Sequence, residues 1–131
     1  VVTLSGPVNQ DRIREHYARA DCFAMASFAE GVPVVLMEAM SMQIPCVTSQ
    51  ITGIPELITH GQTGLLSPPS NVDGLVEQLE RLIADPALAR QLGEAGRTQV
   101  QEHYNLRDNA AQLGRIFAER VTDSPRLTPA S

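Results

Sequence analysis

The sequence contains no lysine and no tryptophan, and aromatic residues make up only 4 % of its 131 positions. All 10 basic residues are arginines, and with 15 acidic residues they give a formal net charge of −5. Nucleic-acid-binding domains concentrate basic side chains on one face and often interleave them with aromatic ones. No such basic stripe is present here, so we expect no nucleic acid among the partners of this chain.

The chain also lacks a long apolar run and a secretory signal pattern. No stretch approaches the ~20 apolar residues that a membrane-spanning helix requires. The only two cysteines, Cys22 and Cys46, fall in segments predicted as strands, which favours buried, reduced thiols. We therefore expect a cytoplasmic protein. No cluster of residues has metal-ligand spacing, and we expect no protein-bound metal and no cofactor.

The hydrophobic content of 43 % and charged content of 19 % are typical of one soluble globular domain. Strand-like and helix-like segments alternate along the first half of the chain, which predicts a parallel sheet with helices on both faces. The expected strands are 1–5, 21–26, 46–49 and 65–66; the expected helices are 9–20, 32–42, a turn at 54–59, and then 71–84, 86–103 and 106–120. We expect residues 1–120 to form the domain and residues 121–131 a disordered tail.

Side chains that accept hydrogen bonds from free N–H groups are expected to begin several of these helices. Asn9 and Asn71 precede apolar periodic segments and are typical N-caps, and Asp85-Pro86 should start the following helix. Tyr104-Asn105 should interrupt the C-terminal helical region. His60 lies in a tight turn, where we expect a structural role.

The most informative stretch is 30–40, which holds Glu30 and Glu38 in apolar surroundings. Pro33 suits the first turn of a helix, so this helix should begin at about residue 32 or 33, with Glu30 in the preceding loop. Its residues are almost all apolar, which predicts burial on all sides. Glu38 would then need a donor side chain, a backbone amide or a ligand hydroxyl, because an unpaired buried charge is costly.

The spacing of the two acids distinguishes between two kinds of site. Eight residues of helix rise roughly 12 Å and separate the two side chains by about 80°. Glycosidase carboxylates flank one bond at about 5 to 9.5 Å. The wider spacing favours an extended ligand along the helix start, where free N–H groups attract an anion such as phosphate. An ion pair without a ligand remains an alternative explanation of the pair.

The order of the segments places this stretch at a ligand-binding edge. In parallel sheets ligands bind beyond the carboxyl ends of the strands. The Glu30 loop leaves the second expected strand, and the 50–53 loop leaves the third. A flavodoxin-type interaction domain, similar to a response regulator, would share the alternation, but it would not explain the two acids.

Over residues 1–120 the chain resembles the C-terminal domain of group 1 retaining glycosyltransferases of the GT-B fold. This resemblance implies a partial doubly wound parallel sheet, Rossmann-like, with flanking helices and a helical C-terminal region. The matching blocks, in chain order, are Ser5-Gly6, Tyr17-Ala18-Arg19-Ala20-Asp21, Ser27-Phe28-Ala29-Glu30-Gly31-Val32-Pro33, Leu36-Met37-Glu38-Ala39-Met40, Pro45-Cys46-Val47, Gly53-Ile54-Pro55-Glu56-Leu57 and Gly61-Gln62-Thr63-Gly64-Leu65.

The resemblance assigns roles to individual positions. It implies that Glu30 is the catalytic-site acid that contacts the transferred sugar, and that Glu38 accepts hydrogen bonds from the ribose hydroxyls. Donor-binding residues would be Gly6 near the nucleobase and the backbone near Gly31, Val32 and Pro33 around the sugar and diphosphate. The function implied is sugar transfer from a nucleotide-sugar to an acceptor, in polysaccharide or glycoconjugate synthesis, at the inner face of the membrane or in the cytoplasm.

The chain departs from the family pattern at single positions and in whole segments. Ala26 stands in place of a usual Pro, Val32 in place of a bulkier residue, and Gln43 and Thr52 in place of usual glycines. The family's acceptor-binding N-terminal domain and two further strands, which carry an Arg and a Lys that clamp the diphosphate, have no counterpart here. We therefore expect a fragment, inactive alone, whose open strand edges favour a homodimer. A non-catalytic nucleotide-binding or assembly module is the alternative.

Overall fold

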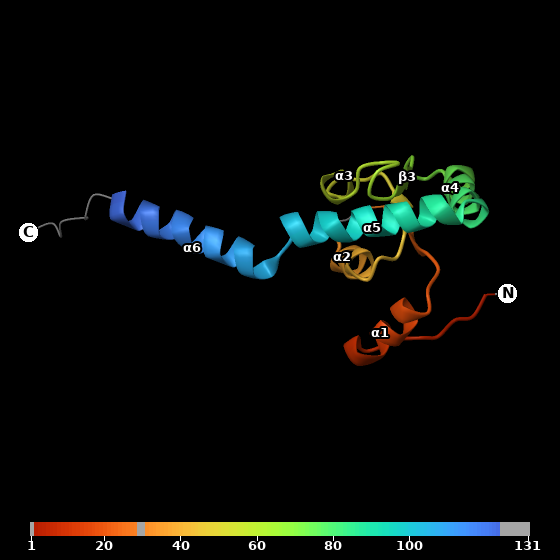
Figure 1. The fold of residues 1–131 in the computed structure, drawn as a ribbon, viewed down its shortest axis with the longest axis horizontal. Helices are drawn as coiled ribbons and strands as arrows, with labels where there is room; N and C mark the ends of the chain where they lie inside the picture. Colours follow the sequence, from red (N-terminus) through yellow and green to blue (C-terminus); the bar gives the residue numbers. More distant parts are fainter. Residues whose placement is uncertain (1, 29–30, 124–131) are drawn as a thin grey trace, which may run out of the picture.

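The computed structural model describes residues 2–28 and 31–123. These residues form a small parallel sheet, helices around it, and a C-terminal helical extension (Figure 1). The elements in chain order are α1 (Gln10–Ala18), β1 (Phe23–Met25), α2 (Val34–Ser41), β2 (Cys46–Ser49), α3 (Ile54–Leu57), β3 (Leu65–Ser67), α4 (Val72–Ala84), α5 (Pro86–His103) and α6 (Leu106–Asp123).

The sheet has the order β1-β2-β3, and both neighbouring pairs run parallel. Phe23 is in register with Cys46, and Ser49 with Ser67. The central strand β2 is buried at all four residues, as expected for a parallel strand covered on both faces. This confirms the predicted α/β class and places the carboxyl ends of three strands at one edge.

Two apolar cores lie on opposite faces of the sheet. Leu36 and Met40 of α2 belong to the larger core, which includes Cys46 and Leu66 of the sheet together with α3. Val47 and Leu65 point the other way into a core with α4 and α5. Apolar side chains alternate between these two sides because successive strand residues face opposite directions.

The caps predicted at Asn9 and Asn71 are confirmed, and so is the helix start predicted at Asp85-Pro86. The Oδ1 atoms of Asn9 and Asn71 accept the backbone N–H of the third residue onward, at 3.1 and 2.8 Å. Asp85 does the same for Leu88 at 3.0 Å, ahead of Pro86 in the first turn of α5. The predicted interruption at Tyr104 is also present, because α5 ends at His103 and α6 begins at Leu106.

The strand predicted over residues 1–5 is wrong: residues 2–9 have no regular secondary structure. A strand needs a neighbour to pair with its backbone groups. In the family's sheet, the resemblance implies, two further strands lie between this segment and β1, and the expected neighbours of residues 1–5 therefore have no counterpart among the described residues. Residues 1, 29, 30 and 124–131 lie outside the described residues, and with them the role predicted for Glu30 and most of the tail predicted over 121–131. Residues 121–123 of that predicted tail belong to α6.

The helix predicted over 32–42 is shorter and less buried than expected. α2 covers Val34–Ser41, with Pro33 as its N-cap. Val34 and Val35 are 62 and 43 % exposed, whereas Leu36 and Ala39 are fully buried. The expectation of burial on all sides is therefore wrong, because the sheet and α5 cover only one side of this helix.

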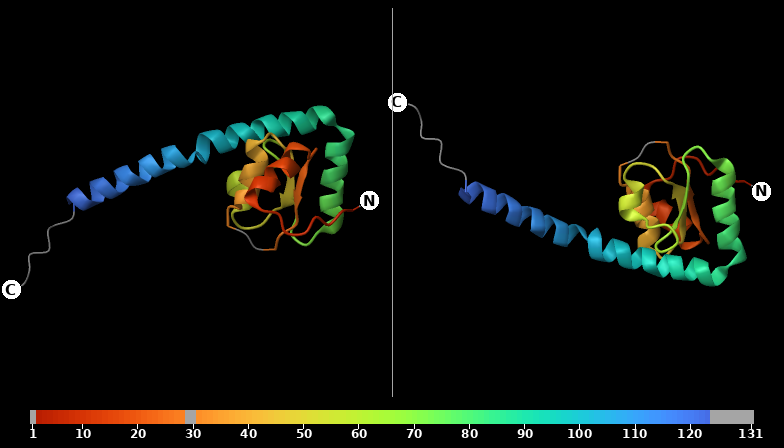
Figure 2. Two further views of the ribbon diagram at one scale, coloured as in Figure 1. Left: turned by 90° about the horizontal axis from the view of Figure 1, so that it is seen from below. Right: turned by 90° about the horizontal axis from the view of Figure 1, so that it is seen from above.

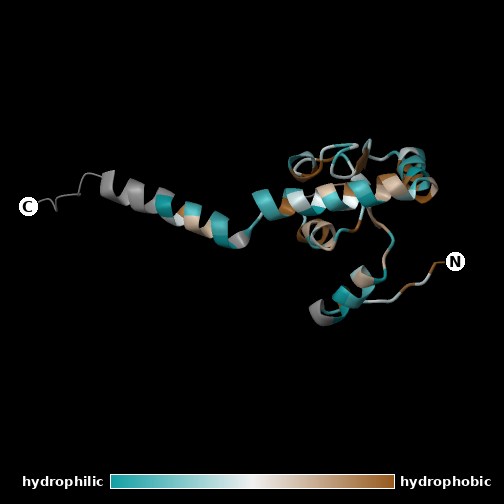
Figure 3. Cartoon of the chain, viewed as in Figure 1, coloured by the Kyte–Doolittle hydropathy of each residue, from teal (hydrophilic) through white to brown (hydrophobic). Residues whose placement is uncertain are grey.

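α1 and α6 lie at the periphery of the fold. α1 is set apart from the rest in Figure 1, and Tyr17 and Ile13 connect it to the larger core. α6 continues beyond the end of α5 and leaves the body of the molecule in all three views (Figures 1 and 2). The part of α6 that is coloured in Figure 3 mixes hydrophilic and hydrophobic residues. No helix among the described residues is both long and apolar enough to cross a bilayer.

Candidate ligand site at the start of α2

The loop before α2 and the loop after β2 meet at the carboxyl edge of the sheet. A Cβ atom added to Gly53 would lie 2.5 Å from the carbonyl oxygen of Gly31. Only glycine permits this approach at position 53. Gly53 is therefore the residue whose missing side chain allows the two loops to meet.

The start of α2 offers free backbone donors beside this contact. The first hydrogen bonds of the helix run from the N–H groups of Leu36 and Met37 to the carbonyl oxygen of Pro33. The helix has no side-chain cap at Pro33. The N–H groups of Val34 and Val35, both exposed residues, thus begin the helix without partners inside it, and a helix start of this kind attracts anions.

Glu38 lies in the second turn of α2 and is half-buried. Its Oε2 atom accepts a hydrogen bond from the hydroxyl of Tyr17, at 3.2 Å. The same hydroxyl lies 3.3 Å from the carbonyl oxygen of Val35. Glu38 was predicted to need a donor, and Tyr17 of α1 supplies one.

Tyr17 is itself buried, with 6 % of its surface exposed, and its ring packs against Phe23 at 6.1 Å between centroids. Burial, followed by the negative charge of Glu38, raises the pKa of Tyr17 to about 12. The hydroxyl is therefore protonated at neutral pH and remains a donor to the carboxylate.

The carboxyl ends of β2 and β3 carry buried polar side chains. Thr48 and Ser67 are 0 and 2 % exposed, and their hydroxyl oxygens have no hydrogen-bond partner within the described residues. Buried polar groups are nearly always paired in native proteins. Their position at the edge where parallel sheets bind ligands marks this edge as polar.

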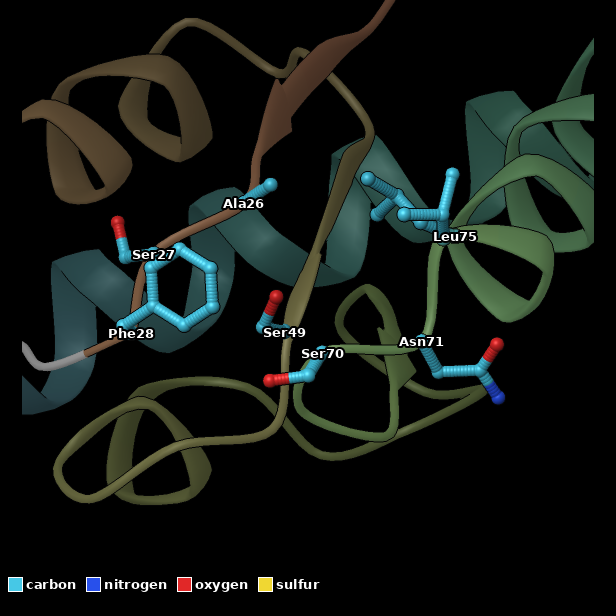
Figure 4. Close-up of a pocket in the computed structure, with 8 residues that line it drawn as sticks. Ala26, Ser27, Phe28, Ser49, Ser70, Asn71 and Leu75 are labelled. Carbon is cyan, nitrogen blue, oxygen red and sulfur yellow. The ribbon is translucent and has the colours of Figure 1, made fainter.

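A small cleft of about 70 Å³ lies at the same edge, on the α4 side of the sheet (Figure 4). Ser49 of β2, Ser70 and Asn71 before α4, and Phe28 after β1 surround it in the close-up. Neither Ser49 nor Ser70 was among the predicted site residues. Ser49 could have been found from its position at the end of a predicted strand. Ser70 has a left-handed backbone, with a φ of +57°, and a serine gives no sequence signal for that conformation.

The other predicted site residues fall in different places. Gly31, Val32 and Pro33 form the loop into α2, and their predicted part in donor binding remains a prediction. Gly6 is exposed in the segment before α1, and a Cβ added there would meet no atom within 4 Å, so the structure does not bring it against Glu38. Glu30 lies outside the described residues, and its role remains a prediction.

His60 and Cys46 are two residues for which the sequence predicted a structural role. Nδ1 of His60 accepts the backbone N–H of Leu66 at 2.9 Å, which confirms its structural role in the turn before β3. Burial raises the pKa of the Cys46 thiol to about 12. Among the described residues, no group of three or more His, Cys, Asp and Glu side chains is placed to hold a metal ion.

The fold and the edge described above define an α/β domain of the GT-B glycosyltransferase type. The model of the family described as glycosyl transferases group 1 matches residues 1–99, and the chain belongs to this family. It is 33 % identical over 114 residues to N-acetyl-alpha-D-glucosaminyl L-malate synthase of Bacillus anthracis, a match covering 87 % of this chain and 30 % of that protein.

Solved structures share the fold of this chain. Sucrose-phosphate synthase from Thermosynechococcus elongatus superposes with a TM-score of 0.85 and 31 % identity, covering 93 % of this chain and 31 % of that one. Anabaena HepE, solved in complex with UDP-glucose, superposes with a TM-score of 0.77 at 23 % identity over 82 % of this chain and 30 % of that one. The chain thus spans about a third of the length of these proteins.

Proposed function

We propose that the chain is the donor-binding part of a retaining glycosyltransferase that moves a sugar from a nucleotide-sugar to an acceptor. The observation that carries the proposal is the position of Glu38. Glu38 stands one turn beyond the unpartnered start of α2, and in parallel sheets of this kind ligands bind at the edge from which such helices begin. One extended ligand with a diphosphate and a diol fits the two features together.

Different groups of the site would bind different parts of the nucleotide-sugar donor. The N–H groups of Val34 and Val35 stand where an anionic diphosphate gains from the helix dipole, before and after the sugar–phosphate bond breaks. The carboxylate of Glu38 accepts hydrogen bonds from ribose hydroxyls. Glu30, by the resemblance, faces the transferred sugar from the preceding loop.

Acceptor binding and the cellular role would depend on parts of the longer protein outside these residues. We propose that the longer protein contributes an acceptor-binding N-terminal domain and the Arg and Lys that hold the diphosphate, since this chain contains no lysine. It would act in the cytoplasm or at the inner face of the membrane, in polysaccharide or glycoconjugate synthesis. Transfer depends on positioning both substrates, so the chain alone should transfer no sugar.

Titration calorimetry with UDP and with GDP tests nucleotide binding by the chain, and a transfer assay with the nucleotide-sugars tests turnover. We expect one nucleotide to bind and no turnover until the N-terminal part of the parent protein is supplied. Binding without turnover even in the complete protein would favour the alternative, a non-catalytic nucleotide-binding module. Binding of neither nucleotide to the complete protein would contradict both.

A further inference from the structure

Tyr17 is the one described side chain that donates to the carboxylate of Glu38, and it comes from a different element, 21 positions earlier in the chain. Its hydroxyl is fixed by two neighbours, Oε2 of Glu38 at 3.2 Å and the carbonyl oxygen of Val35 at 3.3 Å. Its ring is held by burial and by Phe23. The hydroxyl therefore has little freedom to leave the carboxylate.

A glutamate side chain on a half-exposed helix face normally samples several rotamers, and ordering it on ligand binding costs conformational entropy. A ligand that meets an already ordered carboxylate avoids part of this cost. An ionised carboxylate has about four acceptor positions, and Tyr17 occupies one of them, on Oε2. The remaining positions are sufficient for the two hydroxyls of a ribose.

We propose that Tyr17 is a positioning residue that fixes the Glu38 carboxylate for recognition of the vicinal hydroxyls of the donor's ribose. The proposal rests on the proposed function, because it assigns the ligand of Glu38. It adds that nucleotide recognition by α2 depends on α1, an element outside the glutamate-containing stretch. It also gives α1, which has few other contacts with the sheet, a defined role at the site.

The test compares UDP or GDP, whichever the protein binds, with its 2′,3′-dideoxy analogue, which lacks both ribose hydroxyls. Tyr17→Phe keeps the ring and removes the donor. We expect it to weaken the ribonucleotide by about three- to tenfold, the net effect of one hydrogen bond, and to leave the dideoxy analogue nearly unchanged. A merely structural role would weaken both nucleotides equally.

Tyr104→Phe is the matched control. The Tyr104 hydroxyl also donates to a carbonyl oxygen, but to that of Glu56 in α3, at 2.9 Å, rather than to a group on α2. This variant should preserve the preference for the ribonucleotide. If it lowers that preference as much as Tyr17→Phe does, the effect is not specific to Glu38 and the proposal is overturned.

Nucleotide affinities measured in the Glu38→Gln variant distinguish a failure of the role proposed for Tyr17 from a failure of the proposed function. If Tyr17 acts through Glu38, Tyr17→Phe should have a much smaller effect on ribonucleotide affinity there than in the wild type. Full additivity of the two substitutions would overturn the role of Tyr17 while leaving Glu38 as the ribose ligand. If Glu38→Gln itself leaves the ribonucleotide preference unchanged, the proposed function fails at Glu38 and the role of Tyr17 fails with it.

Discussion

Gly53 approaches Gly31 so closely that a methyl group on Gly53 would lie 2.5 Å from the Gly31 carbonyl oxygen. This contact joins the loop after β2 to the loop that leads into α2. The two loops come from neighbouring parallel strands, so their contact sets where the start of α2 lies relative to the sheet edge.

We predict that Gly53→Ala destabilises the chain by about 1 to 3 kcal/mol, because the backbone of Gly31 must move to accommodate the added methyl group. Thermal and urea unfolding measure the effect. Gly114→Ala is the control: it lies on exposed α6, where an added Cβ meets no atom within 4 Å, and should be neutral or slightly stabilising. Equal unfolding free energies for Gly53→Ala and the wild type would contradict the close contact.

A second prediction concerns the turn before β3. His60→Ala removes the acceptor of the Leu66 N–H, and Leu66 is only 7 % exposed. Leaving a buried donor unsatisfied should cost about 1 to 3 kcal/mol in the free energy of unfolding. His16→Ala, an exposed substitution on α1, is the comparison and should change stability far less. Similar losses in both variants would mean that the His60 bond contributes nothing specific.

The pKa of Tyr17, raised to about 12, makes stability depend on alkaline pH. Above pH 10 the unfolded tyrosine loses its proton while the native one keeps it, so the native state binds more protons. Stability from this group is therefore present below about pH 10 and lost as the pH rises toward 12.

The sequence has two tyrosines, so Tyr104→Phe leaves Tyr17 as the only one and isolates its ultraviolet titration. We expect tyrosinate to form at higher pH in the native chain than in urea. The unfolding free energy of wild type should also fall more steeply over this range than that of Tyr17→Phe. A native titration midpoint near 10 would contradict the burial of Tyr17 beside Glu38.

We predict that the chain self-associates through the unpaired outer edge of β1. β1 pairs only with β2 in the described sheet, and the N–H of Phe23 points to β2, donating to Pro45 at 3.0 Å. Because successive N–H groups of a strand alternate in direction, the N–H of Ala24 points to the open edge. Such edges pair with other strands, and a two-fold pairing of two copies closes them.

Sedimentation velocity over a range of concentrations measures this association. We expect a reversible dimer for the chain and a monomer for Ala24→Pro, which removes the outward donor and is tolerated at an edge strand. A monomeric wild type at high concentration would count against the pairing. A dimer that survives in Ala24→Pro would place the interface elsewhere.

The parts of the fold that the sequence predicted well depend on local interactions. Asn9, Asn71 and Asp85 cap their helices through backbone groups three residues away, so a short sequence window contains both partners. Gln43, noted as a departure from a usual glycine of the family, has a φ of +62°, the left-handed backbone that glycine adopts most easily at a helix end.

The parts that could not be predicted depend on distant partners. Residues 2–5 have strand-like composition but no neighbouring strand to pair with. Val34 and Val35 are exposed because the elements that cover α2 lie on its other side, which no local pattern records. The Tyr17–Glu38 bond joins two elements, and the sequence showed only that Glu38 needed some donor.

The central claim is that Glu38 holds the ribose and Glu30 the transferred sugar. Glu38→Gln keeps the shape of the side chain but loses its charge, and charge-assisted hydrogen bonds are worth about 1.5 to 3 kcal/mol. Calorimetric titration of the parent enzyme with nucleoside diphosphate should therefore show roughly ten- to a hundredfold weaker binding in Glu38→Gln. Glu30→Gln should bind the nucleotide nearly as wild type does while sugar transfer falls. Unchanged nucleotide affinity in Glu38→Gln, with a shifted melting temperature instead, would make Glu38 a structural acid and contradict the donor-site assignment.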